Sequence, residues 1–160
     1  MHKMAQEALI LYYSQFGNTA RLASKIRQLT GADILRIQPT TDFPADMKET
    51  DRVYRQQRRQ GQWPKLANQW PDFNYYDVIL VGGPVWDGQL SSPVLAALEQ
   101  LQGFAGKVAP FSTGWSELGN YEQDWQAHAG KLRLCPGYHV LTHGRPHYDQ
   151  ANLMSWLRKL

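Results

Sequence analysis

A short segment near the N-terminus has the composition of an anion-binding loop. In Ser14-Gln15-Phe16-Gly17-Asn18-Thr19, two hydroxyls and two amides flank a glycine. An apolar run precedes the segment and a helical pattern follows it, so backbone N–H groups and the positive end of a helix dipole converge there. The glycine would let the backbone close around a phosphate, although Ser14 and Asn18 could also simply cap a helix. Neither G-x-G-x-x-G nor a P-loop is present, which argues against an ordinary NAD or nucleoside triphosphate site.

Two later segments combine glycines with a tryptophan. One runs from Gly82 to Gly88 and holds Trp86; the other runs from Ser112 to Gly119 and holds Trp115. Each follows an apolar run, so a large flat ring is expected beside the phosphate loop. A phosphate loop and two aromatic loops together predict a pocket for a flat ring with a phosphorylated tail, the shape of flavin mononucleotide (FMN).

The elements that must position these loops alternate along the chain. Apolar runs predict strands at 8–13, 33–37, 76–81, 107–111 and 138–141. Amphipathic spacing, caps and glycine stops predict helices at 18–30, 45–60, 93–101, 121–128 and 150–159. This order predicts an α/β fold with a parallel sheet and helices on both faces, because parallel neighbours need crossovers. In such sheets ligands bind beyond the carboxyl ends of the strands, where all three loops lie.

Length and composition set further limits. The chain has 160 residues, and its 17 Lys+Arg and 14 Asp+Glu give a net charge of +3, which fits one folded domain over residues 1–160. A single cysteine, Cys135, excludes a disulfide framework and fits a reducing cytoplasm. The N-terminus has neither a signal-peptide nor a transit-peptide pattern. No apolar run approaches the roughly 20 residues that a membrane span needs, so no membrane insertion is expected.

Several spaced motifs resemble the flavodoxin family, in particular its short-chain flavodoxin-like branch. The resemblance runs from about Ala8 to the C-terminus. The segments that carry it are the phosphate-loop motif Tyr12–Thr19, the helix start Pro44–Thr50, the strand and ring loop Tyr76–Trp86, the strand and loop Gly106–Gly114, and Trp156-Leu157 in the last helix.

The resemblance implies a doubly wound five-stranded parallel sheet of order 2-1-3-4-5 that binds one FMN without a covalent bond. By position in the family motif, the phosphate would be held by Ser14, Gln15, Phe16, Gly17, Asn18 and Thr19. The ring would be covered by Pro84, Val85 and Trp86, with Trp86 stacking on it, and Thr113 and Gly114 would offer N–H groups to the pyrimidine edge. The same loops add Asp87, Ser112, Trp115 and Gly119 to the predicted cofactor site.

The chain departs from the family pattern at three places. Phe16 stands where a hydroxyl residue is common, Asp87 where the branch tends to have a second tryptophan, and Trp115 and Glu117 where it tends to have a second glycine with a small neighbour. A carboxylate near the ring would disfavour the negative charge of the reduced flavin. Asp87 and Glu117 are therefore hypothesised to lower its reduction potential.

Other interpretations rest on single motifs. Ser116 lies in a sequence one residue short of G-x-S-x-G, and a downstream histidine (His139, His143 or His147) could complete a hydrolase site. The glycine and proline between His143 and His147 deny those two a shared helix face for a metal. Basic residues on the second predicted helix indicate a solvated face or a docking surface for an acidic partner, and no motif for specific nucleic-acid binding accompanies them. These residues are Arg52, Arg55, Arg58 and Arg59.

The sequence thus predicts an FMN-binding, flavodoxin-like redox protein that carries electrons between partner proteins, a reductase and an acceptor. The alternative is an FMN-dependent NAD(P)H oxidoreductase acting on a quinone or similar small acceptor. A third possibility is a flavodoxin-like scaffold that has lost its cofactor and binds other proteins.

Overall fold

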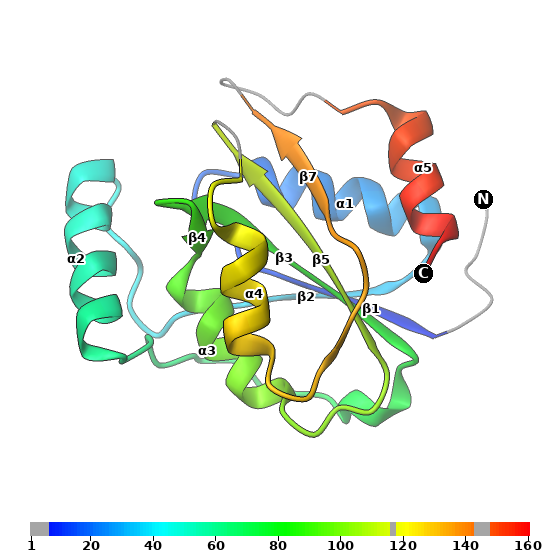
Figure 1. The fold of residues 1–160 in the computed structure, drawn as a ribbon, viewed down its shortest axis with the longest axis horizontal. Helices are drawn as coiled ribbons and strands as arrows, with labels where there is room; N and C mark the ends of the chain where they lie inside the picture. Colours follow the sequence, from blue (N-terminus) through cyan, green and yellow to red (C-terminus); the bar gives the residue numbers. More distant parts are fainter. Residues whose placement is uncertain (1–6, 116–117, 143–147) are drawn as a thin grey trace.

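The structure, a computed structural model, describes residues 7–115, 118–142 and 148–160. Strands and helices alternate along most of the described chain (Figure 1). The strands are β1 (Ala8–Tyr12), β2 (Asp33–Arg36), β3 (Val78–Trp86), β4 (Gln89–Leu90), β5 (Lys107–Gly114), β6 (Arg133–Leu134) and β7 (Tyr138–Leu141). The helices are α1 (Asn18–Thr30), α2 (Met47–Gln60), α3 (Ser92–Leu101), α4 (Tyr121–Ala129) and α5 (Gln150–Arg158), with a 3-10 turn η1 (Phe73–Tyr75).

The strands form one sheet of order β2-β1-β3-β5-β6, which confirms the α/β fold and the predicted strand order. These neighbours pair in parallel, whereas β4 pairs antiparallel with β3 as a short hairpin, and β7 pairs with β5 beyond β6. Within the described ranges the sheet has seven strands, two more than the five that were predicted. The β3–β4 hairpin adds one strand. β6 adds the other, because it precedes the last predicted strand, β7, and pairs with β5 separately from it.

A bulge separates β6 from β7. Val108 pairs with Leu134 and Phe111 pairs with Tyr138, so two residues of β5 (109–110) face three residues of the last strand (135–137). Pro110 and Pro136 both lie in this stretch and lack the N–H that a continuous ladder would need. An extra residue in one strand of a pair interrupts the ladder and bends the strand.

Two cores sandwich the sheet, because side chains of successive strand residues point to opposite faces. Leu9, Leu11 and Val81 pack with residues of α2, α3 and α4, while Ile10 and Leu80 pack with residues of α1 and α5. Figure 1 shows α3 and α4 in front of the strands and α1 behind them. Helices on both faces are therefore confirmed. No helix in the described ranges is long and apolar enough to span a membrane.

The third and fourth predicted strands are longer than expected. β3 continues through Gly82, Gly83 and Pro84 to Trp86, where a turn after Val81 was predicted. A Cβ at Gly82 would lie 2.1 Å from the Phe111 ring, so glycine is required there by packing against β5 and not by a turn. β5 likewise extends to Gly114, so Ser112 and Thr113 are strand residues rather than loop residues.

Helix boundaries agree more closely. α3 begins at Ser92, one residue before the predicted start, and the left-handed Gly31 ends α1. α2 begins at Met47 instead of Ala45, because the Asp46 side chain accepts a hydrogen bond from the Lys48 N–H and so caps the helix there.

Candidate functional site

A cleft of about 440 Å³ lies at the carboxyl ends of β1, β3 and β5. This is the edge of the sheet where ligands bind in open α/β folds. Most of the predicted site residues line it. The lining consists of Ser14, Gln15, Phe16, Asn18, Thr19, Met47, Pro84, Val85, Trp86, Thr113, Gly114, Trp115 and Thr142.

The loop after β1 is closed on itself by Ser14. The Gly17 N–H donates to the Ser14 Oγ at 3.1 Å, and the Ser14 side chain is almost fully buried. Gly17 has φ of +100°, a left-handed conformation that favours glycine. As the N-cap of α1 it provides no side-chain cap, so first-turn N–H groups remain available for a ligand. The loop therefore has the geometry of an anion site.

Two arginines and several hydrogen bonds to other elements surround this loop. The Arg36 Nη2 at the end of β2 donates to the Ser14 carbonyl at 2.7 Å, and the Arg21 Nη1 lies 3.4 Å from the Asn18 Oδ1. The hydroxyls of Thr19 and Thr113 are 2.7 Å apart and buried, which ties the start of α1 to the end of β5. Two guanidinium groups therefore lie close to the loop, and the loop is tied to the ends of β2 and β5.

Gln15 leaves an unused acceptor at the cleft. Its Nε2 donates to the Pro44 carbonyl at 3.0 Å and to the Thr50 Oγ1 at 2.9 Å. Because a carbonyl can only accept, these contacts fix the orientation of the amide. The Gln15 Oε1 is buried and has no hydrogen-bond partner among the described residues. A ligand hydroxyl that donates to this oxygen would satisfy it, so the donor set suits a polyol phosphate.

The aromatic residues of the cleft divide into buried and exposed ones. Trp86 is only 7% exposed, and its ring packs edge-on with Tyr13, Phe43 and Tyr54 at centroid distances of 5.8, 5.1 and 5.3 Å. Phe16 and Trp115, by contrast, are 53% and 68% exposed. Stacking by Trp86 stays a prediction, and the structure adds Phe16 and Trp115 as accessible rings at the mouth.

Four predicted residues lie outside the lining of the cleft. Gly17 shapes the loop backbone. The Ser112 side chain lies on the face of the sheet opposite to that of its neighbour Thr113, and its Oγ is 2.8 Å from the His139 Nδ1. A Cβ on Gly119 would lie 2.9 Å from the Gly88 Cα, so Gly119 permits a close approach of two turns. Asp87 lies in the β3–β4 turn, where its Oδ1 is 3.5 Å from the Arg55 Nη2.

The hairpin that carries Asp87 is bonded at Leu90 of β4 to a buried ion pair between Arg58 and Asp124. The Arg58 Nη1 donates to the Asp124 Oδ1 at 3.0 Å, and Asp124 also accepts from the Leu90 N–H at 2.8 Å. Burial raises the pKa of the Asp124 carboxyl, but hydrogen bonds from Arg58 and the Leu90 N–H outweigh it and leave the pKa below its usual value. Arg58 is only 17% exposed at its side chain, so the prediction of a solvated face was wrong for this residue.

The other arginines of α2 are mostly paired on the surface. Arg52 contacts Glu49 at 3.0 Å, and Arg55 contacts Asp51 at 2.8 Å. Four residues of the other interpretations lie outside the described residues: Ser116, Glu117, His143 and His147. The hydrolase site, the metal site and redox tuning by Glu117 therefore stay predictions. Within the described ranges, no group of three or more His, Cys, Asp or Glu side chains could hold a metal ion.

Sequence reasoning missed Met47 and Thr142 as cleft residues. Thr142 follows β7 directly, so the rule that placed the other loops at strand ends could have found it. Met47 is the first residue of α2, and only the tertiary packing of that helix brings it to the cleft.

The sequence model of one family, described as flavodoxin, matches residues 7–160. The chain belongs to the flavodoxin family. No curated protein matches the chain.

Among solved structures, this flavodoxin-family chain is similar to a flavoprotein from Lactobacillus acidophilus NCFM, crystallised in complex with FMN. The identity is 27% and the TM-score 0.82, over 96% of this chain and 99% of that one. The apo form of the flavoprotein from that organism, solved by NMR, is 29% identical with a TM-score of 0.70, over 96% and 98% of the two chains. A flavoprotein described as putative, from Bacteroides eggerthii, shares the fold at 20% identity and a TM-score of 0.83, over 96% and 97%.

Proposed function

We propose that this chain binds one FMN, without a covalent bond, in the cleft at the ends of β1, β3 and β5. Three observations support the proposal. The cleft lies where this fold binds ligands, the family model covers nearly the whole chain, and a similar flavoprotein of matching length was crystallised with FMN.

The residues present fit this cofactor. The phosphate would be held by the loop 14–19, with the Ser14 hydroxyl and the first N–H groups of α1 as donors and Arg36 nearby as a positive charge. The Gln15 Oε1 would accept from a hydroxyl of the sugar-alcohol chain. The ring would lie between Pro84–Trp86 of β3 and Gly114-Trp115 at the end of β5.

Electron carriage between partner proteins is the function that we propose for the loaded chain. FMN supplies both one-electron and two-electron chemistry when it is bound. Phe16, Met47 and Trp115 expose half or more of their surface around the mouth of the cleft. Exposed apolar side chains that gather at one place favour contact with another protein. The observation that carries the proposal is this apolar mouth, and we expect a reductase and an acceptor protein as partners in the cytoplasm.

FMN binding is tested first, by absorbance. The purified protein is mixed with excess FMN, desalted, and its flavin bands are compared with its protein content. We expect about one flavin per chain. Loss of all flavin on desalting and the absence of saturable binding at equilibrium would contradict the proposal and favour a scaffold without cofactor.

The second test separates carrier from enzyme. FMN-loaded protein is mixed anaerobically with NADH or NADPH, alone and with catalytic amounts of a flavodoxin reductase, and bleaching of the flavin is followed in time. A carrier is bleached quickly only when the reductase is present. Equally fast bleaching by the nucleotide alone would favour the alternative function, an FMN-dependent NAD(P)H oxidoreductase.

A further inference from the structure

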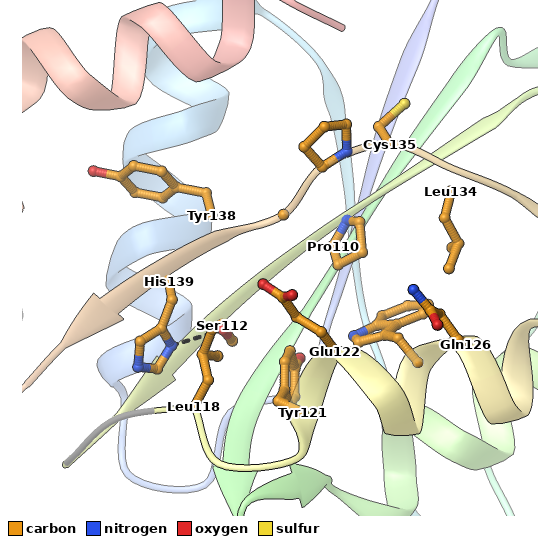
Figure 2. A pocket seen from close by; sticks show the side chains of 13 residues that line it. Pro110, Ser112, Leu118, Tyr121, Glu122, Gln126, Leu134, Cys135, Tyr138 and His139 are labelled. Atoms are coloured by element: carbon orange, nitrogen blue, oxygen red, sulfur yellow. Dashed lines mark hydrogen bonds between the residues drawn. The ribbon is translucent and has the colours of Figure 1, made fainter.

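A second cavity, here called the α4 cavity, lies on the opposite face of the sheet from α1. It has a volume of about 420 Å³ and lies between α4 and the bulge that separates β6 from β7 (Figure 2). Among the described residues, none lines both this cavity and the cleft at the strand ends. Because the last strand is interrupted at 135–137, the side chains of α4 face a gap there in place of a continuous ladder.

One end of the α4 cavity is a wall of hydrogen-bonding groups. The Ser112 Oγ and the His139 Nδ1 are 2.8 Å apart, and Figure 2 shows Tyr121 beside them. Burial raises the pKa of Tyr121 to about 12, against smaller lowering effects of Trp125 and Ser112, so the phenol stays protonated. Trp125 is 2% exposed, and its Nε1, which lies close enough to the Tyr121 hydroxyl to lower the pKa of that phenol, has no hydrogen-bond partner within 3.5 Å among the described residues. The wall therefore holds buried donors, of which one is unsatisfied.

The rest of the cavity selects against negative charge. Its walls include the apolar side chains of Pro110, Leu118 and Leu134, and the described lining contains no Lys or Arg. Glu122 brings a carboxylate, which projects from α4 into the gap toward β7 in Figure 2. A bound anion would meet this charge, and no Lys or Arg of the described lining would offset it. A neutral ligand that both accepts and donates hydrogen bonds would satisfy both ends.

We propose that the α4 cavity binds a small, uncharged aromatic molecule that carries an amide group. The carbonyl oxygen of the amide accepts from the donors around Tyr121, its N–H group donates to Glu122, and the ring lies against the apolar side chains. The inference does not depend on FMN, because the cleft and the α4 cavity have separate linings.

The probe for this proposal is benzamide, titrated into ¹⁵N-labelled protein with and without FMN. The readout is the indole N–H resonance of Trp125, assigned by its absence in Trp125→Phe. We expect a saturable shift of this resonance, larger than those of the other indoles, with benzoate binding at least tenfold more weakly than benzamide because of Glu122. Toluene, which lacks the amide, is also expected to bind at least tenfold more weakly.

Two variants test the named contacts. Tyr121→Phe should weaken benzamide at least tenfold, whereas Tyr75→Phe, which removes an exposed phenol elsewhere, should not. Glu122→Gln changes only an exposed side chain and should remove most of the discrimination against benzoate, whereas Glu99→Gln on α3 should leave it intact. A cavity that holds solvent only would give no saturable shift. That result, or equal binding of benzamide, benzoate and toluene, would overturn the proposal whether or not FMN binds.

Discussion

Ser14 contributes twice to the loop after β1, because its hydroxyl accepts from the Gly17 N–H and still has a proton to donate. We expect Ser14→Ala to weaken FMN about tenfold, the equivalent of ~1.5 kcal/mol for a hydrogen bond to a charged group. Quenching of flavin fluorescence measures the affinity. Riboflavin, which lacks the phosphate, should bind both proteins equally.

The matched control for Ser14→Ala is Thr41→Ala, which removes an exposed hydroxyl outside the cleft. It should leave both affinities unchanged. If Ser14→Ala weakened riboflavin as much as FMN, the hydroxyl would act on the ring or the sugar-alcohol chain, and the phosphate assignment for this loop would be wrong.

Asp87 and Arg55 form an ion pair near the cleft, and their opposite charges should have opposite effects on the reduction potential of a bound flavin. The Asp87 side chain is 47% exposed, and Arg55 lies 3.5 Å from it. Asp87→Asn should therefore raise the potential for forming the reduced, negatively charged flavin, and Arg55→Gln should lower it. Because solvent and salt screen both groups, each shift of the two-electron potential should stay below about 30 mV, which is a tenfold change in the equilibrium constant for a two-electron couple.

A redox titration with reference dyes measures these potentials, and the double variant serves as the control. It should return close to the wild-type value, since the two changes cancel. Shifts of the same sign in both single variants would show that Asp87 acts through the backbone of its turn, where its φ is +52°, and not through charge.

The sequence predicted which residues meet at the cleft better than it predicted the directions of their side chains. The types around Ser14, Pro84 and Thr113 indicated which segments meet, because strand ends of a parallel sheet meet at one edge. Whether Trp86 faces a ligand or the core depends on Tyr13, Phe43 and Tyr54, which come from three other segments. Such packing leaves no local signal in the sequence.

At the scale of elements, the ion pair between α2 and α4 holds the β3–β4 hairpin in place. Asp124 receives hydrogen bonds from Arg58 and from the Leu90 N–H, and the Tyr54 hydroxyl donates to the Leu90 carbonyl at 2.6 Å. Asp124→Asn leaves a largely buried guanidinium without its counter-charge. We expect it to reduce the free energy of unfolding at neutral pH by about 3 kcal/mol.

The effect of Asp124→Asn should depend on pH. The folded-state pKa of Asp124 is lowered, so its charge stabilises the fold above the usual aspartate pKa of about 3.9, and this contribution is lost as the pH falls through the lowered value. Urea unfolding at several pH values should show the wild-type advantage shrinking below about pH 4. Asp51→Asn, in an exposed pair on α2, is the control with a small effect. A pH-independent difference would contradict the role of the charge.

Element order was predictable from periodicity, whereas strand length was not. Gly82-Gly83-Pro84 has the composition of a turn, yet the strand continues because Gly82 accommodates the Phe111 ring of β5. The split of the last strand follows from the register of β5 against 133–141, which involves Pro110 of β5 and Pro136 between β6 and β7. Both features depend on pairs of residues that are far apart in sequence.

For the whole molecule, pairing on α2 reduces the case for a basic docking surface. The net charge is +3, but Arg52, Arg55 and Arg58 each contact a carboxylate. The exposed apolar side chains at the mouth of the cleft are the stronger candidates for partner contact. We therefore expect the rate of reduction by a reductase to depend more on Phe16 and Trp115 than on salt concentration.

FMN should also stabilise the whole fold, because the cleft joins strand ends that are far apart in the chain. The loop after β1 and the end of β5 are tied to each other only by folded-state contacts such as Thr19–Thr113. A ligand that binds the folded state alone, at 100 times its Kd, adds about 2.7 kcal/mol. For a chain of this size we expect Tm to rise by roughly 5–10 °C in a thermal scan. Riboflavin at the same concentration should give a smaller rise, since it lacks the phosphate. An unchanged Tm, in samples whose absorbance shows bound flavin, would mean that the flavin binds the unfolded chain equally well and that the cleft is not its site.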